Sequence, residues 1–511
     1  MTISTNAVPD TASLGRPTAR RAWWPVVLVF VVAAVARLSV ILRSGGLHGS
    51  FGYDAAVYFG ASDALSHGRV PYRDFVYLHP PGMILSLTPF AWLTRLVSDE
   101  WAFTIANLSF AILGSVNAVL VLVIGKKLGF GRTPALIGAL FYATWFGAIG
   151  SEYLTKLEPV GNFYFLCALL AVATARHRNS RWLIVAAGVA LGLAVSVKIW
   201  WIVPAVGVMV WYALTHRRVR GAAAMLAGAC ASAVLVNLPF FLLAPHQMWS
   251  SVISDQLGRN RGNSNPLSRI GDLTTLTRLS AYLSRSGEVV GGIIIVIIFA
   301  VVVVRAWRVT IARPVVILVA VQLALVLAAP SWFAYYCDYL AVGLALTVAA
   351  AATRRDAAEG LPRATAMAWL PTVAVASISA VVLLLGASAV QPFRGTARLI
   401  QGVAGASCVM SDEPMGQIEL NALSRGLAHG CPNWIDVTGR TYGPDRPRPA
   451  GVSRANNHRW QADLTRYLRS GDAIIIMRRG GTGISKATQR AISSDGVLVR
   501  AGGHVVYRVR H

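Results

Sequence analysis

Long apolar stretches alternate with short polar segments over most of the chain. Each stretch is close to the roughly 20 residues that a transmembrane helix needs to cross a bilayer. The stretches lie at 22–42, 100–125, 133–151, 159–175, 182–199, 200–215, 221–243, 289–304, 314–333, 337–353 and 365–388. The pattern predicts an all-α polytopic membrane domain of about eleven helices over residues 22–390, preceded by a polar tail at 1–21.

Arginine and lysine fill the short connections on one side of the predicted helices. With the tail in the cytoplasm and 22–42 as an uncleaved signal anchor, the alternation brings every strongly basic connection to that side, as the positive-inside rule expects. These connections hold Lys126, Lys127 and Arg132; Arg176, Arg178 and Arg181; Arg217, Arg218 and Arg220; Arg305, Arg308 and Arg313; and Arg354, Arg355 and Arg363. Residues 43–99, 152–158, 244–288 and 391–511 are then extracytoplasmic. Within the first of these loops, 51–67 and 83–97 read as interfacial or re-entrant helices.

The pattern changes to short alternating units after about residue 395. Strand-like CVMS, WIDV, AIIIM, VLVR and VVYRV alternate with helical stretches near 413–428, 459–469 and 484–493. This alternation predicts a small extracytoplasmic α/β domain over 391–511. Cys408 and Cys431 both fall in it, and an oxidising compartment favours a disulfide between them.

Composition agrees with a membrane protein. Hydrophobic residues make up 55% of the chain and charged residues only 14%, whereas a soluble domain carries about 25% charged residues. The net charge of +25 is dispersed among the connections and forms no single patch, which argues against nucleic acid. The basic residues of the chain instead follow the positive-inside rule. The functional alternative is that they attract anionic lipid or phosphate.

The first extracytoplasmic loop carries the most informative motif, FGYDAAVYFGASDALSHGRVPYRDFVYLHPPG. It places Asp54 shortly after the first span, then an aromatic-rich helix that contains Tyr58, and then His79 before Pro80, Pro81 and Gly82. This arrangement resembles the GT-C superfamily of membrane glycosyltransferases. It is most similar to the branch that uses lipid carriers, with protein O-mannosyltransferases and bacterial cell-envelope mannosyl- and arabinosyltransferases.

Asp54 is the candidate catalytic base. Sugar transfer to a hydroxyl requires a carboxylate that accepts the proton of the acceptor as the new bond forms. The alternative is a helix-capping residue, because aspartate is a favoured N-cap. Relatives often carry a second acid beside this aspartate, but here the neighbour is Ala55, which weakens a two-acid metal site. We therefore assign no metal ligand and no cofactor, and leave a requirement for a divalent cation open.

The second extracytoplasmic loop, EYLTKLEPVGNFYF, contributes three charged candidates. The resemblance implies a catalytic carboxylate near the start of the following helix, and Glu158 is the best match. Glu152 and Lys156 are candidates for substrate binding, with simple solvation as the alternative for all three.

A lipid-phosphate donor needs cations at its leaving group, because negative charge builds on the phosphate as the glycosidic bond breaks. The resemblance points to His79. Lys198 is a second candidate because a cation within an apolar stretch must face a cavity or reach the interface. Arg259 and Arg261 in the loop QLGRNRG are further candidates, with a surface role as the alternative.

The aromatic stretch WFAYYCDYL completes the set of candidates. Tyr335 and Tyr336 lie where relatives carry an aromatic-His-Tyr pattern, and we consider both, with Tyr58, as substrate-binding residues. Interfacial aromatic residues need no special role, so anchoring is the alternative.

The resemblance implies an inverting glycosyltransferase. It would move a sugar, mannose or arabinose by family, from a polyprenyl-phosphate carrier to an envelope glycan or glycolipid. The topology fits, since the connections predicted as cytoplasmic show no nucleotide-binding signature. A flippase for a lipid-linked sugar would use the same basic and aromatic cavity without the base. A third possibility is a catalytically silent scaffold whose α/β domain binds cell-wall glycan. The richness in Arg, Ala and Gly suggests a bacterial plasma membrane as its location.

Overall fold

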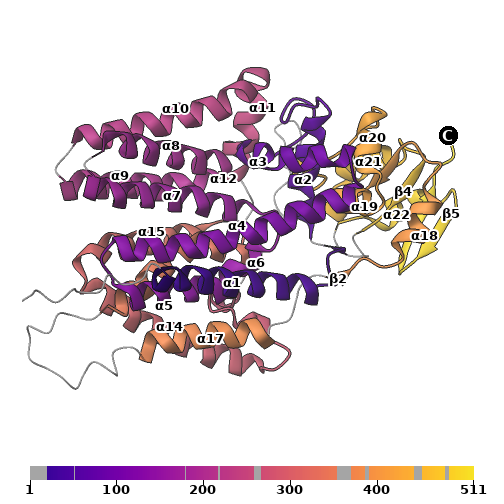
Figure 1. Ribbon diagram of the computed structural model, residues 1–511. Coiled ribbons are helices and arrows are strands. Elements are labelled where there is room, and N and C mark those ends of the chain that lie inside the picture. The colour runs from indigo at the N-terminus through magenta and orange to yellow at the C-terminus, as the bar shows by residue number, and fades with distance from the viewer. Residues whose placement is uncertain are drawn as a thin grey trace, which may run out of the picture.

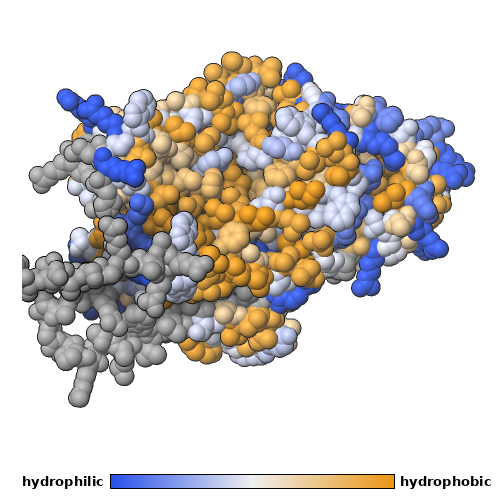
Figure 2. Space-filling model, in the orientation of Figure 1, coloured by the Kyte–Doolittle hydropathy of each residue, from blue (hydrophilic) through white to orange (hydrophobic). Residues whose placement is uncertain are grey.

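The computed structural model has a long helical part with a small α/β domain at one end (Figure 1). It describes residues 20–50, 52–178, 180–216, 219–257, 266–353, 370–385, 391–441, 452–477 and 483–511. The helical part is coated with apolar side chains, whereas hydrophilic side chains dominate the surface of the α/β domain (Figure 2). An apolar exterior of this kind is stable in a bilayer and not in water.

The helices of the first part coincide with the apolar stretches of the sequence. They are α1 (Arg20–Arg43), α4 (Asp99–Lys127), α5 (Arg132–Thr144), α6 (Phe146–Glu152), α7 (Leu157–Arg178), α8 (Arg181–Val197), α9 (Ile202–His216), α10 (Val219–Leu243), α14 (Arg285–Trp307), α15 (Arg313–Ala328), α16 (Ala341–Ala351) and α17 (Leu370–Leu385). The chain is a multi-pass membrane protein.

The apolar helices differ in length. Among the described residues, seven helices are long and apolar enough to cross a membrane, or eight if the pair α5 and α6, which is bent by 54°, is one span. Both α8 and α9 are shorter apolar helices, separated by a 3-10 turn at Ile199–Trp201. The predicted count of eleven is therefore not confirmed.

Two of the basic connections, 126–132 and 305–313, lie next to the last residues of α16, at the end of the helical part away from the α/β domain (Figure 1). The Arg132 guanidinium lies 5.2 Å from the ring centroid of Trp24, near the start of α1. Arg305 donates to the carbonyl of Ala351 at 3.3 Å, and Thr353 donates to that of Phe130 at 3.3 Å. These contacts agree with the predicted alternation of helix directions.

Short helices line the end of the helical part that faces the α/β domain. They are α2 (Tyr53–Ser66), α3 (Gly82–Ala91), α11 (Pro245–Trp249), α12 (Asp255–Leu257) and α13 (Pro266–Leu273). Helix α2 matches the stretch at 51–67, but it is buried along most of its length, from Ala55 to Ala64. It packs against α3 and against the α/β domain, so it forms part of the junction between the two parts of the chain.

The α/β domain contains a four-stranded sheet in the order β3-β4-β6-β5. The strands are β3 (Val409–Ser411), β4 (Ala473–Ile475), β5 (Val497–Ala501) and β6 (His504–Arg508). β3 and β4 are parallel, and the other two pairs are antiparallel. The helices are α18 (Thr396–Gly402), α19 (Pro414–Glu419), α20 (Leu423–Ala428), α21 (His458–Leu468) and α22 (Lys486–Ser493).

One predicted strand of this domain, WIDV, is wrong. Residues 435–438 form turns instead, because the Asp436 carboxylate accepts hydrogen bonds from the backbone N–H of Gly439 at 2.7 Å and from the Thr438 hydroxyl at 3.2 Å. A short aspartate side chain that bonds to its own backbone competes with strand pairing.

Hydrogen bonds join the α/β domain to the helical part. Asp99 at the start of α4 accepts from the backbone N–H groups of Leu423 at 2.8 Å and Ser424 at 3.1 Å. The Ser424 hydroxyl donates to Asp63 of α2 at 2.5 Å. In addition, β1 (Gly49–Ser50) pairs with β2 (Gln391–Pro392). The domain is thus fixed to the extramembrane ends of α2 and α4.

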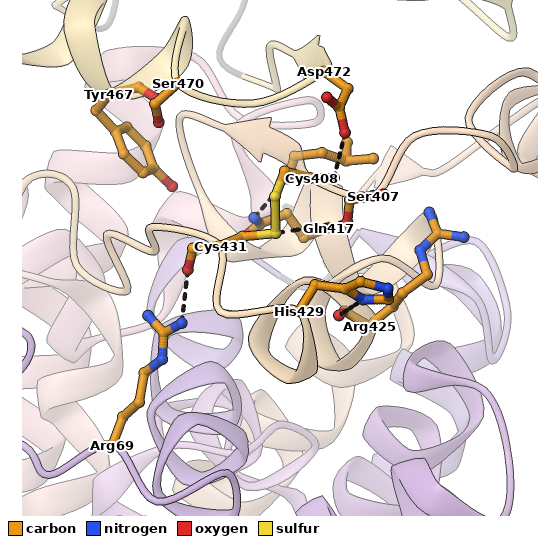
Figure 3. The surroundings of a disulfide bond; sticks show 11 residues. Arg69, Ser407, Cys408, Gln417, Arg425, His429, Cys431, Tyr467, Ser470 and Asp472 are labelled. Carbon is orange, nitrogen blue, oxygen red and sulfur yellow. Dashed lines mark hydrogen bonds between the residues drawn. A yellow bond between two sulfur atoms is a disulfide. The ribbon is translucent and has the colours of Figure 1, made fainter.

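A disulfide lies next to this junction. Cys408 and Cys431 are bonded, with their Cα atoms 5.7 Å apart. Arg69, from the loop after α2, donates to the carbonyl of Cys431 at 2.7 Å, and Asp472 accepts from the N–H of Cys408 at 2.8 Å (Figure 3). The disulfide therefore ties the segment after α20 to the first strand of the sheet, and Arg69 ties that segment to the helical part.

Candidate active site

A polar cavity of about 100 Å³ opens at the junction between the two parts of the chain. Its walls come from the start of α2, the loop before α3, the end of α8, the segment around 331–336 and the α/β domain. The lining residues are Tyr53, Asp54, Val57, Tyr58, Tyr77, Leu78, His79, Leu157, Lys198, Ser331, Phe333, Tyr335, Tyr336, Asp436, Thr438 and Arg454. The cavity therefore gathers six of the candidates named from the sequence.

Asp54 lies in the first turn of α2, where Gly52 is the N-cap. Its carboxylate accepts from Lys156 Nζ at 3.0 Å, and 27% of its side chain is exposed. Burial alone would raise the pKa of Asp54, but the Lys156 ammonium, a hydrogen bond from Tyr335 and the nearby His79 outweigh burial and hold that pKa below its ordinary value of 3.8. Asp54 is thus an ionised carboxylate at the cavity wall, able to accept a proton.

Lys198 lies at the end of α8, where the backbone becomes extended (φ −152°, ψ 129°). Its ammonium pairs with Glu158 at 2.7 Å, and the two side chains are only 4% and 1% exposed. The same nitrogen lies 4.1 Å from the ring centroid of Trp200 and 4.2 Å from that of Tyr336. Among the described residues, the second carboxylate oxygen of Glu158 has no hydrogen-bond partner. A buried cation with a carboxylate and two aromatic faces is held in place and does not snorkel to the interface.

His79 reaches the cavity because its loop lies tightly against α8. A Cβ atom on Gly82 would lie 2.5 Å from the carbonyl oxygen of Ser196, so only glycine allows this approach. Tyr72 donates its hydroxyl to the His79 carbonyl at 2.6 Å. The His79 ring meets Tyr58 and Tyr77 edge to face, with centroids 5.8 and 6.1 Å away. The Pro-Pro-Gly motif thus positions His79 on the same cavity as Lys198.

The two tyrosines of the aromatic stretch lie beside the two lysines. Both belong to a 3-10 helix at Ala334–Leu340. The Tyr335 ring centroid is 4.4 Å from Lys156 Nζ, while Tyr336 faces Lys198. Each lysine is therefore held between a carboxylate and an aromatic ring, and both pairs lie at one cavity.

Five candidates are not among the lining residues in the described part of the chain. Lys156 and Glu158 adjoin the cavity through their ion pairs with Asp54 and Lys198. Glu152 is fully buried between helices, where it forms an ion pair with Arg37 and accepts hydrogen bonds from Tyr142 at 2.8 Å and Asn117 at 3.1 Å. Arg37 is a cation within α1 and needs a buried negative partner, which Glu152 provides. Glu152 therefore lies apart from the other charged candidates. Arg259 and Arg261 lie outside the described residues.

The polar lining residues that sequence reasoning missed are Tyr53, Ser331, Tyr77, Asp436, Thr438 and Arg454. The last three come from the α/β domain, roughly 380 to 400 positions from Asp54. Nothing in their local sequence marks them as polar groups of a membrane-proximal cavity. Tyr77 was available as a signal, since it is two residues from His79 in the same motif.

Within the described residues, no group of three or more His, Cys, Asp or Glu side chains could hold a metal ion. The cavity is lined by Lys198, His79 and Arg454, and Lys156 is bonded to Asp54 at its wall. This set suits an anion such as a phosphate, with ionised Asp54 at its edge.

Known proteins are similar to this chain in sequence family and in fold. The model of Glycosyltransferase family 87 matches residues 77–330. This match covers just under half of the chain, and the chain as a whole has the fold of the GT-C glycosyltransferases. The oligosaccharyltransferase of Archaeoglobus fulgidus shares the GT-C fold, with a TM-score of 0.55 at 14% identity over 88% of this chain and 67% of that one.

A second GT-C structure is similar over nearly the whole length of both chains. ArnT from Cupriavidus metallidurans in the apo state has a TM-score of 0.53 at 15% identity, covering 96% of this chain and 98% of that one. No curated protein is significantly similar to the chain in sequence. At these identities the structural matches establish the GT-C fold, and the chemistry must be argued from the residues of the cavity.

Proposed function

We propose that this glycosyltransferase moves a sugar from a polyprenyl-phosphate carrier to a hydroxyl acceptor outside the cytoplasm, with Asp54 as the base. The observation that carries the proposal is the pairing of Asp54 with Lys156 and of Glu158 with Lys198 around one cavity. Each lysine is balanced by one carboxylate. When a donor binds, a phosphate oxygen can take the place of that carboxylate as the hydrogen-bond partner of the ammonium.

The chemistry follows from where the charges lie. The acceptor O–H loses its proton to the Asp54 carboxylate while its oxygen attacks the anomeric carbon from the face opposite the carrier. The bond from that carbon to the phosphate oxygen breaks, and the electron pair leaves with the polyprenyl phosphate. Lys198, Lys156 and His79 stabilise the charge that builds on the phosphate, and Glu158 holds Lys198 in place. The anomeric configuration is inverted.

The donor class is supported by the location of the cavity and by one relative. The cavity lies at the end of the transmembrane helices, within reach of a headgroup whose chain stays in the bilayer. AglB from Archaeoglobus fulgidus has been solved with an inhibitory peptide and a dolichol-phosphate, and it matches with a TM-score of 0.54 at 12% identity over 90% of this chain and 70% of that one. We propose mannose or arabinose as the sugar and a cell-envelope glycan or glycolipid as the acceptor.

We further propose that the protein lies in a bacterial plasma membrane with the cavity and residues 391–511 outside the cytoplasm. The basic connections at the opposite end of the helices support this orientation. A reporter that is active only in the cytoplasm should stay silent when fused after His511, and activity of that reporter would overturn the orientation.

The test of function is transfer of radiolabelled sugar in proteoliposomes. Purified protein is mixed with polyprenyl-phosphate mannose or polyprenyl-phosphate arabinose and with envelope fractions as acceptors. Lys198→Ala should weaken donor binding because it removes a phosphate partner, whereas Asp54→Asn should bind donor normally and fail to transfer.

The runner-up is a flippase for the same lipid-linked sugar, since a flippase would use the same basic and aromatic cavity without a base. It predicts that labelled donor crosses the vesicle membrane without any labelled product, and that Asp54→Asn moves the donor as fast as the wild-type protein. That pair of results would replace the transferase proposal.

A further inference from the structure

The residue next to the proposed base is held by the α/β domain. Tyr53 directly precedes Asp54 in the first turn of α2, and its hydroxyl donates to the Asp436 carboxylate at 2.6 Å. The same hydroxyl accepts from the backbone N–H of Thr438 at 2.9 Å. The first turn of α2 is therefore bonded to residues more than 380 positions away in the sequence.

Asp436 is itself firmly fixed within its domain. It is 8% exposed, and its Oδ1 atom receives the N–H of Gly439 and the hydroxyls of Thr438 and Tyr53. One oxygen thus organises the turn and anchors α2. Gly439 suits this position because a Cβ atom there would lie 2.6 Å from the Asp436 carboxyl carbon.

The position of this anchor matters because α2 begins at a glycine and is held there by contacts with other segments of the chain. Gly52, at the N-cap, has a φ of 78° and makes no side-chain cap bond, and a Cβ atom at Gly52 would meet no other atom within 4 Å. Asp54 itself is held by Lys156 and Tyr335, the Ala55 carbonyl accepts from the Thr155 hydroxyl at 3.3 Å, and the bond from Tyr53 to Asp436 fixes the first residue of the helix.

We propose that Asp436 is a positioning residue for sugar transfer, which through Tyr53 holds Asp54 at the distance from the acceptor that proton transfer requires. The α/β domain then completes the active site. The inference rests on the proposed function, because it assigns Asp436 a role through the base. Donor binding should not depend on the contact, since Lys198 and His79 are held by α7, α8 and the loop before α3, and Lys156 lies against the Tyr335 ring.

The experiment compares Tyr53→Phe, Asp436→Ala and the double variant in the transfer assay with saturating donor. A displacement of about 1 Å at a reacting group can cost about 10²-fold, and we expect each single variant to lower kcat by roughly tenfold or more, with the donor KM unchanged. The double variant should be no slower than the slower single variant, because both changes break one contact.

Ser424→Ala is the matched control. Its hydroxyl makes another hydrogen bond between the same two parts of the chain, to Asp63 near the far end of α2, and it does not line the cavity. If looser docking of the domain were the cause, Ser424→Ala would lower kcat as much as Tyr53→Phe. We expect it to retain the wild-type kcat.

Three results would overturn the positioning role: additive effects of the two single variants, an equal loss in Ser424→Ala, or a rise in donor KM with kcat unchanged. These outcomes are separable from failure of the proposed function. If Asp54→Asn abolishes transfer while Tyr53→Phe transfers at the wild-type rate, only the positioning role fails. If Asp54→Asn transfers normally, the base assignment itself fails.

Discussion

The ammonium of Lys156 lies 3.0 Å from the Asp54 carboxylate at the cavity wall, although Asp54 belongs to α2 and Lys156 to the loop before α7. An ion pair at this place has two consequences for a transferase. It keeps Asp54 ionised before the substrates bind, and it holds a cation where a donor phosphate would arrive. Once the phosphate takes Lys156, Asp54 loses the charge that lowers its pKa and becomes a stronger base.

Asp54→Asn tests the base directly. Asparagine keeps the size and most hydrogen bonding of aspartate but cannot accept the proton, so kcat should fall by about 10²- to 10⁴-fold, the usual contribution of general acid-base catalysis. Donor binding, measured by retention of labelled lipid, should stay near normal. A residue that only stabilised the helix start would behave differently, because asparagine serves equally well there; transfer at the wild-type rate would move the base assignment to Glu158.

Lys156→Gln tests the electrostatic half of the pair through the pH profile of kcat/KM. The Lys156 ammonium is the main cause that lowers the pKa of Asp54, and burial acts in the opposite direction. Removing the ammonium should therefore raise that pKa, and the acidic limb of the profile should move to higher pH. The variant would lose activity at mildly acidic pH values at which the wild-type protein remains active.

Lys198→Gln provides the control for this shift, because Lys198 lies on the same cavity but pairs with Glu158. It should weaken donor binding and leave the acidic limb in place. An unmoved limb in Lys156→Gln would mean that Asp54 is not the group whose protonation limits the rate.

Much of the helical part could be predicted from the sequence because membrane-spanning helices leave a strong apolar signal. The positions of α4, α10 and α14 follow from this signal alone. The number of spans could not, since the bend between Thr144 and Phe146 and the 3-10 turn before Ile202 depend on packing against neighbouring helices. The strand expected around Asp436 failed for a local reason, because that side chain bonds to its own turn.

The candidate site was predictable to the extent that its residues lie in loops next to spans or are charged residues at the end of a span. Asp54, His79 and Lys198 could be placed by their position and by the resemblance to GT-C enzymes. Glu152 and Glu158 lie six positions apart in the same charged loop, so the sequence does not distinguish them. In the structure, however, Glu152 pairs with Arg37. The direction in which the Glu152 side chain points depends on how α6 is rotated about its axis. Tertiary contacts set that rotation for so short a helix. The contribution of Asp436 needed the structure, because no sequence pattern links it to Tyr53.

Glu152→Gln separates a structural role from a substrate-binding role. The substitution leaves Arg37 buried with no negative partner, which typically costs about 3 to 5 kcal/mol when one member of a buried pair is removed. We expect a lower unfolding temperature in detergent and less folded protein, while the folded fraction keeps a normal donor KM. A variant of unchanged stability with impaired donor binding would instead return Glu152 to the list of substrate-binding residues.

The last prediction concerns Glu419, in α19 at the junction with α4. Burial raises the pKa of the Glu419 carboxyl to about 9, and the nearby Glu100 adds to the rise, so the folded protein holds a neutral acid at pH 7. The carboxyl of the unfolded chain releases its proton near the ordinary value of 4.5. The folded state is therefore favoured below that pH, and it loses stability as pH rises from about 4.5 towards 9, by up to about 1.4 kcal/mol per pH unit.

Glu419→Gln replaces the acid by a neutral amide of the same shape, which has no proton to lose. We expect the variant and the wild-type protein to unfold at similar temperatures near pH 5, and the variant to become the more stable of the two as pH rises towards 9. Thermal unfolding in detergent across this range measures the gap. Parallel curves for the two proteins would mean that Glu419 is ionised in the folded state and that water or a cation reaches it at the junction.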